Sequence, residues 1–134
     1  MNEQSFAYGM KKTLALPVDQ ADARVREELQ KEGFGVLTEI DVQATLKKKL
    51  DVDFRPYRIL GACNPSLAHQ ALSAETDIGL LLPCNVVVYA GENQDESVVA
   101  VLDPEVQLSV TGRDEIRPLA REVRTRMERV LAAL

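Results

Sequence analysis

The stretch RILGACNP, residues 58–65, decides the fold together with its partner GLLLPCNVVVY, residues 79–89. The first stretch indicates a strand that runs into a helix, because the Asn64 side chain can accept from free amides while Pro65 fits the first helical position. The second indicates a buried turn followed by a strand. Each holds a Cys-Asn pair beside a proline, and together they contain both cysteines of the chain. The residues that could carry chemistry are therefore concentrated at one junction.

The totals describe an ordinary globular chain. Its 134 residues, 46% of them hydrophobic and 28% charged, predict a single domain over residues 1–134. A net charge of −5 argues against nucleic-acid binding, which depends on neutralising phosphates with Lys and Arg. No basic, apolar signal segment or membrane-length apolar run is present, so we expect a cytoplasmic protein without membrane contact and with reduced cysteines.

Periodicity predicts the elements before the junction. Residues 6–16 alternate as a half-buried strand does, with Lys12 as the exception on the apolar face. A helix follows, capped by Asp19 and ended by Gly33 in a left-handed conformation. Residues 34–42 then alternate again as a second strand. The remaining predictions are, in order, a short helix over 42–50, a strand over 57–63, a helix from 65 to about 75, buried extended chain over 78–82, a hairpin of 85–90 with 97–102, an extended piece over 106–110 and an amphipathic last helix over 116–134.

The resulting order is β-α-β-α-β-α-β-β-α. Helices between strands allow parallel crossovers, whereas the late hairpin must be antiparallel. The sequence therefore predicts an α+β fold, with a mixed sheet of about five strands and helices packed on it. For the apolar segment 78–82 the alternative is a surface that a second subunit covers.

The two Cys-Asn segments also carry a family resemblance. The runs GACNP at 61–65 and GLLLPCNVVVY at 79–89, with Leu67-Ala68 between them, resemble the bacterial and archaeal family called domain of unknown function 302. The likeness covers nearly the whole chain. It implies a small α+β domain assembled as a homodimer, and it supplies no activity, cofactor or catalytic residue.

Three functional hypotheses follow for the junction. The first is a non-enzymatic, homodimeric binding or interaction domain that holds a small-molecule ligand near Cys63, Asn64, Cys84 and Asn85, and this is the one we favour. The alternative to ligand contact is that Asn64 is only a helix cap and Asn85 only a turn residue. No cofactor and no metal is predicted.

The second hypothesis is a thiol-dependent enzyme or redox sensor. Cys63 would be the reactive thiol, because helix-start amides lower a nearby thiol pKa, with Cys84 as the resolving thiol and His69 as the base. The third is metal binding by the same three residues, against which stands the lack of a fourth ligand. Arg58 joins the candidate site residues, with Glu75 or Asp77 as a possible ionic partner.

Overall fold

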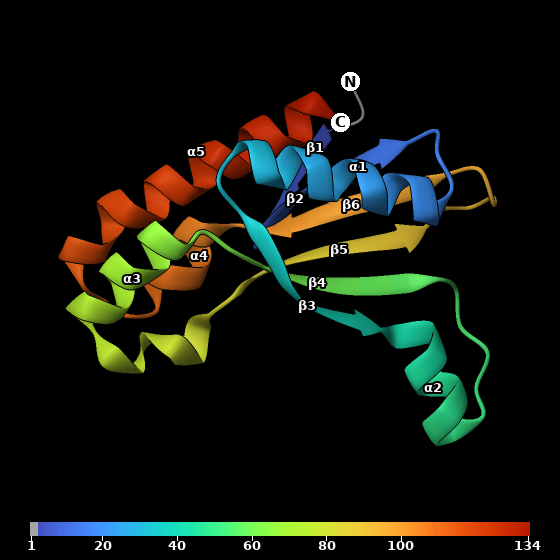
Figure 1. Cartoon of the computed structure of the whole chain (residues 1–134), viewed down its shortest axis with the longest axis horizontal. Coiled ribbons are helices and arrows are strands. Elements are labelled where there is room, and N and C mark those ends of the chain that lie inside the picture. The colour runs from blue at the N-terminus through green and yellow to red at the C-terminus, as the bar shows by residue number, and fades with distance from the viewer. Residues whose placement is uncertain (1–2) are drawn as a thin grey trace.

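The computed structural model describes residues 3–134, which form a six-stranded sheet flanked by helices (Figure 1). The strands are β1 (Glu3–Phe6), β2 (Gly9–Leu14), β3 (Gly35–Asp41), β4 (Tyr57–Cys63), β5 (Cys84–Ala90) and β6 (Ser97–Leu102). The helices are α1 (Val18–Lys31), α2 (Val42–Leu50), α3 (Pro65–Ala74), α4 (Pro104–Ser109) and α5 (Arg117–Ala133), with 3₁₀ turns η1 (Thr76–Leu81) and η2 (Asp114–Ile116). None of the helices within residues 3–134 has the length and apolar character that crossing a bilayer requires.

The α+β fold with helices packed on one sheet is confirmed, and the sheet differs from the prediction in its pairing. Its order is β1-β2-β6-β5-β4-β3, and each of these neighbouring pairs is antiparallel. The helical connections after β3 and β4 do not cross over the sheet. They extend beyond its ends and return the chain beside the strand it left, as a long hairpin connection does (Figure 1).

The predicted first strand is a hairpin. Phe6 pairs with Gly9 across a two-residue turn, so β1 and β2 lie side by side at one edge of the sheet. The predicted exception, Lys12, lies on the core side of β2, where its Nζ donates to the carbonyl oxygens of Leu131 (3.0 Å) and Leu134 (2.6 Å). A lysine is tolerated there because it satisfies the last carbonyls of α5 and complements the negative end of that helix.

The main core lies between one face of the sheet and helices α1 and α5. On α1, the residues spaced by four, Ala21, Val25 and Leu29, are fully buried, as the periodicity predicted. They pack against alternate residues of the central strands, and α5 contributes Met127 and Val130 to the same cluster. Both long helices therefore lie across the same face (Figure 1).

A second, smaller core lies at the end of the sheet where β4 leaves and β5 enters. It joins α3, η1, α4 and the start of α5 through residues such as Ala71, Ile78 and Leu108. Two predictions fail here. Residues 78–82 mostly belong to a 3₁₀ turn, and residues 106–110 end a short helix, α4, whose N-cap Asp103 accepts from the amide of Glu105 at 2.9 Å. Both segments are helical rather than extended, because the chain has to turn back to enclose this second core.

Candidate functional site

Asn64 joins three parts of the chain at the end of β4. Its Oδ1 accepts from the amide of Leu67 at 3.2 Å, which makes it the N-cap of α3, with Pro65 in the first turn as predicted. Its Nδ2 donates to the carbonyl oxygen of Glu32 at 3.4 Å, in the turn that follows α1. The residue is buried, so both ends of the amide are committed to the protein's own backbone.

Cys84 begins β5 opposite Ala62, after a cis peptide bond between Leu82 and Pro83. Its Sγ donates to Oε1 of Gln107 at 3.6 Å, and Nε2 of Gln107 donates in turn to the carbonyl oxygen of Leu81. Burial, together with the nearby Cys63, raises the pKa of Cys84 to about 11. Its thiol is therefore protonated at neutral pH, and a protonated thiol is a poor nucleophile.

Between these two segments lies an apolar cavity of about 350 Å³. Its walls come from both cores: Phe34 and Val123 belong to the main core, and Ala71 and Leu108 to the smaller one. The remaining lining residues are Leu37, Thr38, Ala62, Cys63, Asn64, Leu67, Ala68, Leu72, Gly79, Leu82, Pro83, Cys84, Gln107 and Leu119. Two of the polar groups that line it, the Asn64 amide and the Gln107 amide, are already hydrogen-bonded to the protein.

The structure brings together only part of the predicted set. Cys63, Asn64 and Cys84 line the cavity, as both Cys-Asn segments meet through the antiparallel pairing of β4 with β5. Asn85 does not line it: adjacent residues of a strand point to opposite faces, so Asn85 lies exposed on the far side, opposite Gly61. His69 is exposed on α3 and is also absent from the lining.

Arg58 lies at the other end of β4 and binds carboxylates of α1. Its Nη1 donates to Asp22 at 3.0 Å, and its Nη2 to the exposed Asp19. Burial disfavours the charged guanidinium, but the hydrogen bonds to Asp22 and Asp19 outweigh it and raise the pKa of Arg58. The partners considered from the sequence are therefore wrong; one of them, Glu75, pairs with Arg113 at 3.3 Å.

A metal centre has no structural counterpart in the described part of the chain. Across residues 3–134, no three His, Cys, Asp or Glu side chains are grouped so that they could hold a metal ion. Cys63, Cys84 and His69 in particular are not assembled, because His69 lies outside the cavity that the cysteines line. The trio required by the thiol hypothesis is separated for the same reason.

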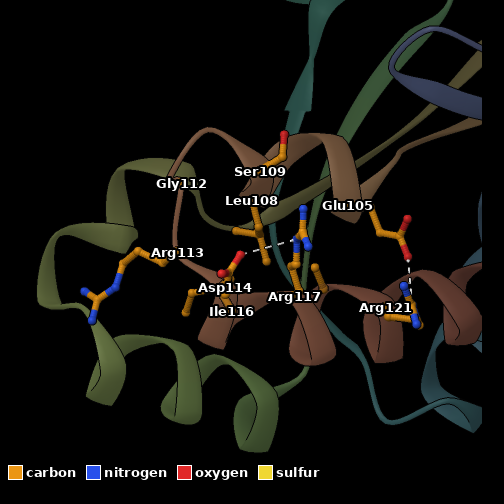
Figure 2. A pocket seen from close by; sticks show the side chains of 10 residues that line it. Glu105, Leu108, Ser109, Gly112, Arg113, Asp114, Ile116, Arg117 and Arg121 are labelled. Carbon is orange, nitrogen blue, oxygen red and sulfur yellow. Dashed lines mark ion pairs between the residues drawn. The ribbon is translucent and has the colours of Figure 1, made fainter.

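Sequence reasoning missed a second cavity, of about 460 Å³, between α4 and the start of α5 (Figure 2). Its charged residues mostly pair with one another: Nε of Arg121 lies 3.5 Å from Glu105, and Nε of Arg117 lies 3.8 Å from Asp114. Arg113 points away from it in Figure 2. Because these cations already have carboxylate partners and are mostly solvent-exposed, this cavity is a weaker candidate than the apolar one.

Local sequence patterns did not predict the apolar cavity either. One signal is a bulge in β3, where the register shifts between Val36 and Thr38 and leaves Leu37 unpaired. Leu37 is 68% exposed and lies at the cavity wall. A large apolar residue turned outward by a bulge is the kind of feature that marks a binding site, and alternation alone did not single it out.

Fold and cavity together define a class: a small α+β domain with helices on one face of an antiparallel sheet and an apolar cavity at one end. The chain belongs to the family described as Domain of unknown function DUF302, whose model matches residues 10–134. It is similar to a solved structure, the crystal structure of uncharacterized conserved protein DUF302 from Bacillus stearothermophilus, with 26% identity and a TM-score of 0.87. That match covers 96% of this chain and 98% of the other. No curated protein matches the chain.

Proposed function

We propose that this chain is a binding domain that holds a small, mainly apolar molecule in the cavity beside Cys63, Asn64 and Cys84. The observation that carries the proposal is the cavity itself. It is a solvent-open pocket of about 350 Å³ that lies between the two cores, with the partly exposed Leu37 and Leu72 at its wall. That volume falls within the range of ligand pockets, about 300–1,000 Å³.

The lining supports an apolar ligand rather than a charged one. The Asn64 and Gln107 amides are hydrogen-bonded within the protein and none of the described residues that line the cavity is charged, so a charged molecule would lose water without gaining an ionic partner. Aliphatic side chains from α3 and α5, among them Leu67, Leu72 and Leu119, line the cavity. Shape and burial of apolar area would therefore provide the affinity.

The thiol hypothesis has less support. Cys84 is a resolving thiol only if it forms a thiolate, and a pKa of about 11 keeps it protonated at neutral pH. Cys63 and Cys84 serve the binding proposal better as small, polarizable wall residues.

Indole is a suitable probe, because it is apolar, small and detectable by its effect on backbone amide NMR signals. In a titration to about 5 mM, we expect saturable shifts confined to the amides of α3 and the adjoining wall, with millimolar affinity. Ala68→Met places a flexible side chain in the cavity and should abolish the shifts. Gln70→Met, on the exposed side of the same helix, should leave them unchanged.

Two results would contradict the proposal. One is a wild-type spectrum that indole leaves unchanged. The other is a set of shifts that persists in Ala68→Met, because the probe would then be bound somewhere other than the cavity.

A further inference from the structure

The lining of the apolar cavity changes from buried side chains to exposed ones. Its floor consists of the buried apolar residues Phe34, Ala62, Ala71, Leu108 and Val123. Its mouth consists of two exposed leucines, Leu37 at 68% and Leu72 at 40%. The cavity therefore runs from the interior to the surface and is apolar at both ends.

The two leucines of the mouth come from segments far apart in sequence. Leu37 lies at the bulge of β3, and Leu72 lies near the end of α3. Gly79 of η1 also lines the cavity, and a Cβ added to it would stand 3.9 Å from Cδ2 of Leu72, so η1 forms part of the wall without adding a side chain there. Scattered exposed leucines are ordinary, but two that converge on one cavity extend its apolar surface outward.

Small residues provide the room inside. Ala68 and Ala71 both line the cavity from α3, where residues three apart are neighbours on one face of a helix. Ala62 adds a third short side chain from the end of β4. A longer side chain at any of these positions would occupy the space that the cavity now leaves for a ligand.

The cavity distinguishes an apolar group from a charged one along its whole length. Among the described residues, none of those that line it is charged. The buried amides of Asn64 and Gln107 already bind the protein's own groups. A charged end of a ligand would therefore lose its hydration inside the cavity without gaining an ionic partner, and it keeps that hydration only outside the mouth.

A compact ligand and an elongated one would use these surfaces differently. A compact molecule that fills the floor leaves Leu37 and Leu72 in water. A chain that reaches from the floor to the mouth covers both leucines as well, and each apolar surface removed from water adds to the affinity. The continuity of floor and mouth thus favours an elongated ligand.

We propose that the ligand of this cavity is a single-chain amphiphile, an unbranched aliphatic chain with one polar end; this inference rests on the binding function proposed above. The chain lies against the floor, passes Leu37 and Leu72 and carries its polar end in water. The length of the chain sets the affinity, because each CH₂ group inside the cavity is removed from water. The polar end contributes little, since it lies beyond the lining.

A series of straight-chain alcohols tests the dependence on length, with the backbone amide NMR signals of the full chain as the readout. We expect the affinity to rise about fourfold for each CH₂ group, or roughly fifteenfold from n-butanol to n-hexanol, with a further rise to n-octanol. Octanoate should bind within about threefold of n-octanol, because its carboxylate stays in water.

Substitution of a mouth residue tests the path of the chain. Leu37→Ser should weaken n-octanol binding roughly fivefold and change n-butanol binding, which uses the floor alone, by less than about twofold. Leu80→Ser is the matched control, because Leu80 is 89% exposed and does not line the cavity. It should leave the binding of both alcohols unchanged. Both leucines are exposed, and circular dichroism verifies that both variants fold.

Three results overturn the proposal while leaving the binding function intact. One is an affinity that does not rise from n-butanol to n-octanol although indole binds. Another is an octanoate that fails to bind where n-octanol does. The third is a loss of n-octanol binding in Leu80→Ser that equals or exceeds the loss in Leu37→Ser. If indole and every alcohol leave the spectrum unchanged, the proposed binding function itself fails, so the two failures are distinguishable.

Discussion

Replacing Asn64 by alanine tests whether the junction beside the cavity is held together by this residue. The change removes the N-cap of α3, in which Oδ1 accepts from Leu67 N at 3.2 Å, and the bond from Nδ2 to the Glu32 carbonyl at 3.4 Å. Loss of an N-cap costs about 1 kcal/mol. The Glu32 carbonyl keeps a donor, Nη1 of Arg126 at 3.0 Å, so losing the long amide bond adds only about 0.5 kcal/mol.

The expected total for Asn64→Ala is therefore about 1.5 kcal/mol of unfolding free energy. With an m value of about 1.5 kcal/mol/M, the urea midpoint falls by about 1 M. Asn64→Ser is the matched control, because its hydroxyl can still accept from Leu67 N while it gives up the bond to Glu32. The serine variant should lose about 0.5 kcal/mol.

Urea unfolding followed by circular dichroism gives both midpoints. We expect alanine to cost clearly more stability than serine. Equal losses in the two variants would show that the cap does not stabilise the junction, and an unchanged midpoint in alanine would show that neither hydrogen bond does. Either result would refute the reasoning from these distances.

Three further predictions concern the surroundings of the junction. Gly33→Ala should lower the unfolding free energy by about 1–3 kcal/mol, because Gly33 has φ +85° and an added Cβ would stand 2.8 Å from Nδ2 of Asn64. The control is Gly35→Ala, where an added Cβ meets open space. It should change the unfolding free energy in urea by less than about 0.5 kcal/mol. Equal effects would contradict this. Asp22→Ala should lower the unfolding free energy by about 1–3 kcal/mol, because the buried carboxylate binds Arg26 and Arg58. Asp19→Ala removes an exposed carboxylate and should lower it by only about 0–0.5 kcal/mol in the same assay. A larger loss in Asp19→Ala than in Asp22→Ala would contradict the assignment of the stabilising ion pairs to Asp22. The folded pKa of Cys84, about 11, lies above its ordinary value of 9.0, so its stabilising contribution is complete below pH 9 and is lost as pH rises through 11. Unfolding free energy should thus fall more steeply between these pH values in wild type than in Cys84→Ala, and parallel curves would argue against a buried thiol.

Short sequence patterns correctly predicted the elements that depend on interactions between residues close in sequence. The four-residue spacing of Ala21, Val25 and Leu29 marked α1, and the Asn64-Pro65 pair marked the start of α3. The same cap logic was available for α4, since Asp103-Pro104 is an equally good helix start. The prediction of an extended piece over residues 106–110 did not use this signal.

Other features depend on contacts between distant segments. Alternation over residues 6–16 did not reveal the β1–β2 hairpin, because Phe6 and Gly9 face each other across a short turn with little punctuation. Likewise, the cavity is enclosed by elements far apart in sequence, and periodicity does not report their packing. Strand alternation places Cys84 and Asn85 on opposite faces, and the predicted site that contains both residues did not take this into account.

Strand β5 carries apolar residues on both faces, a pattern typical of strands covered on both sides, and within residues 3–134 helices cover only one of these faces.

The central claim is that the junction holds an open apolar cavity rather than a closed packing of its own side chains. A high-resolution crystal structure under xenon pressure tests this most directly, because xenon enters dry apolar cavities. We expect xenon density between Ala68, Leu72 and Leu119, with Asn64 still capping α3. A junction filled by its own side chains, with no xenon between them, would contradict it.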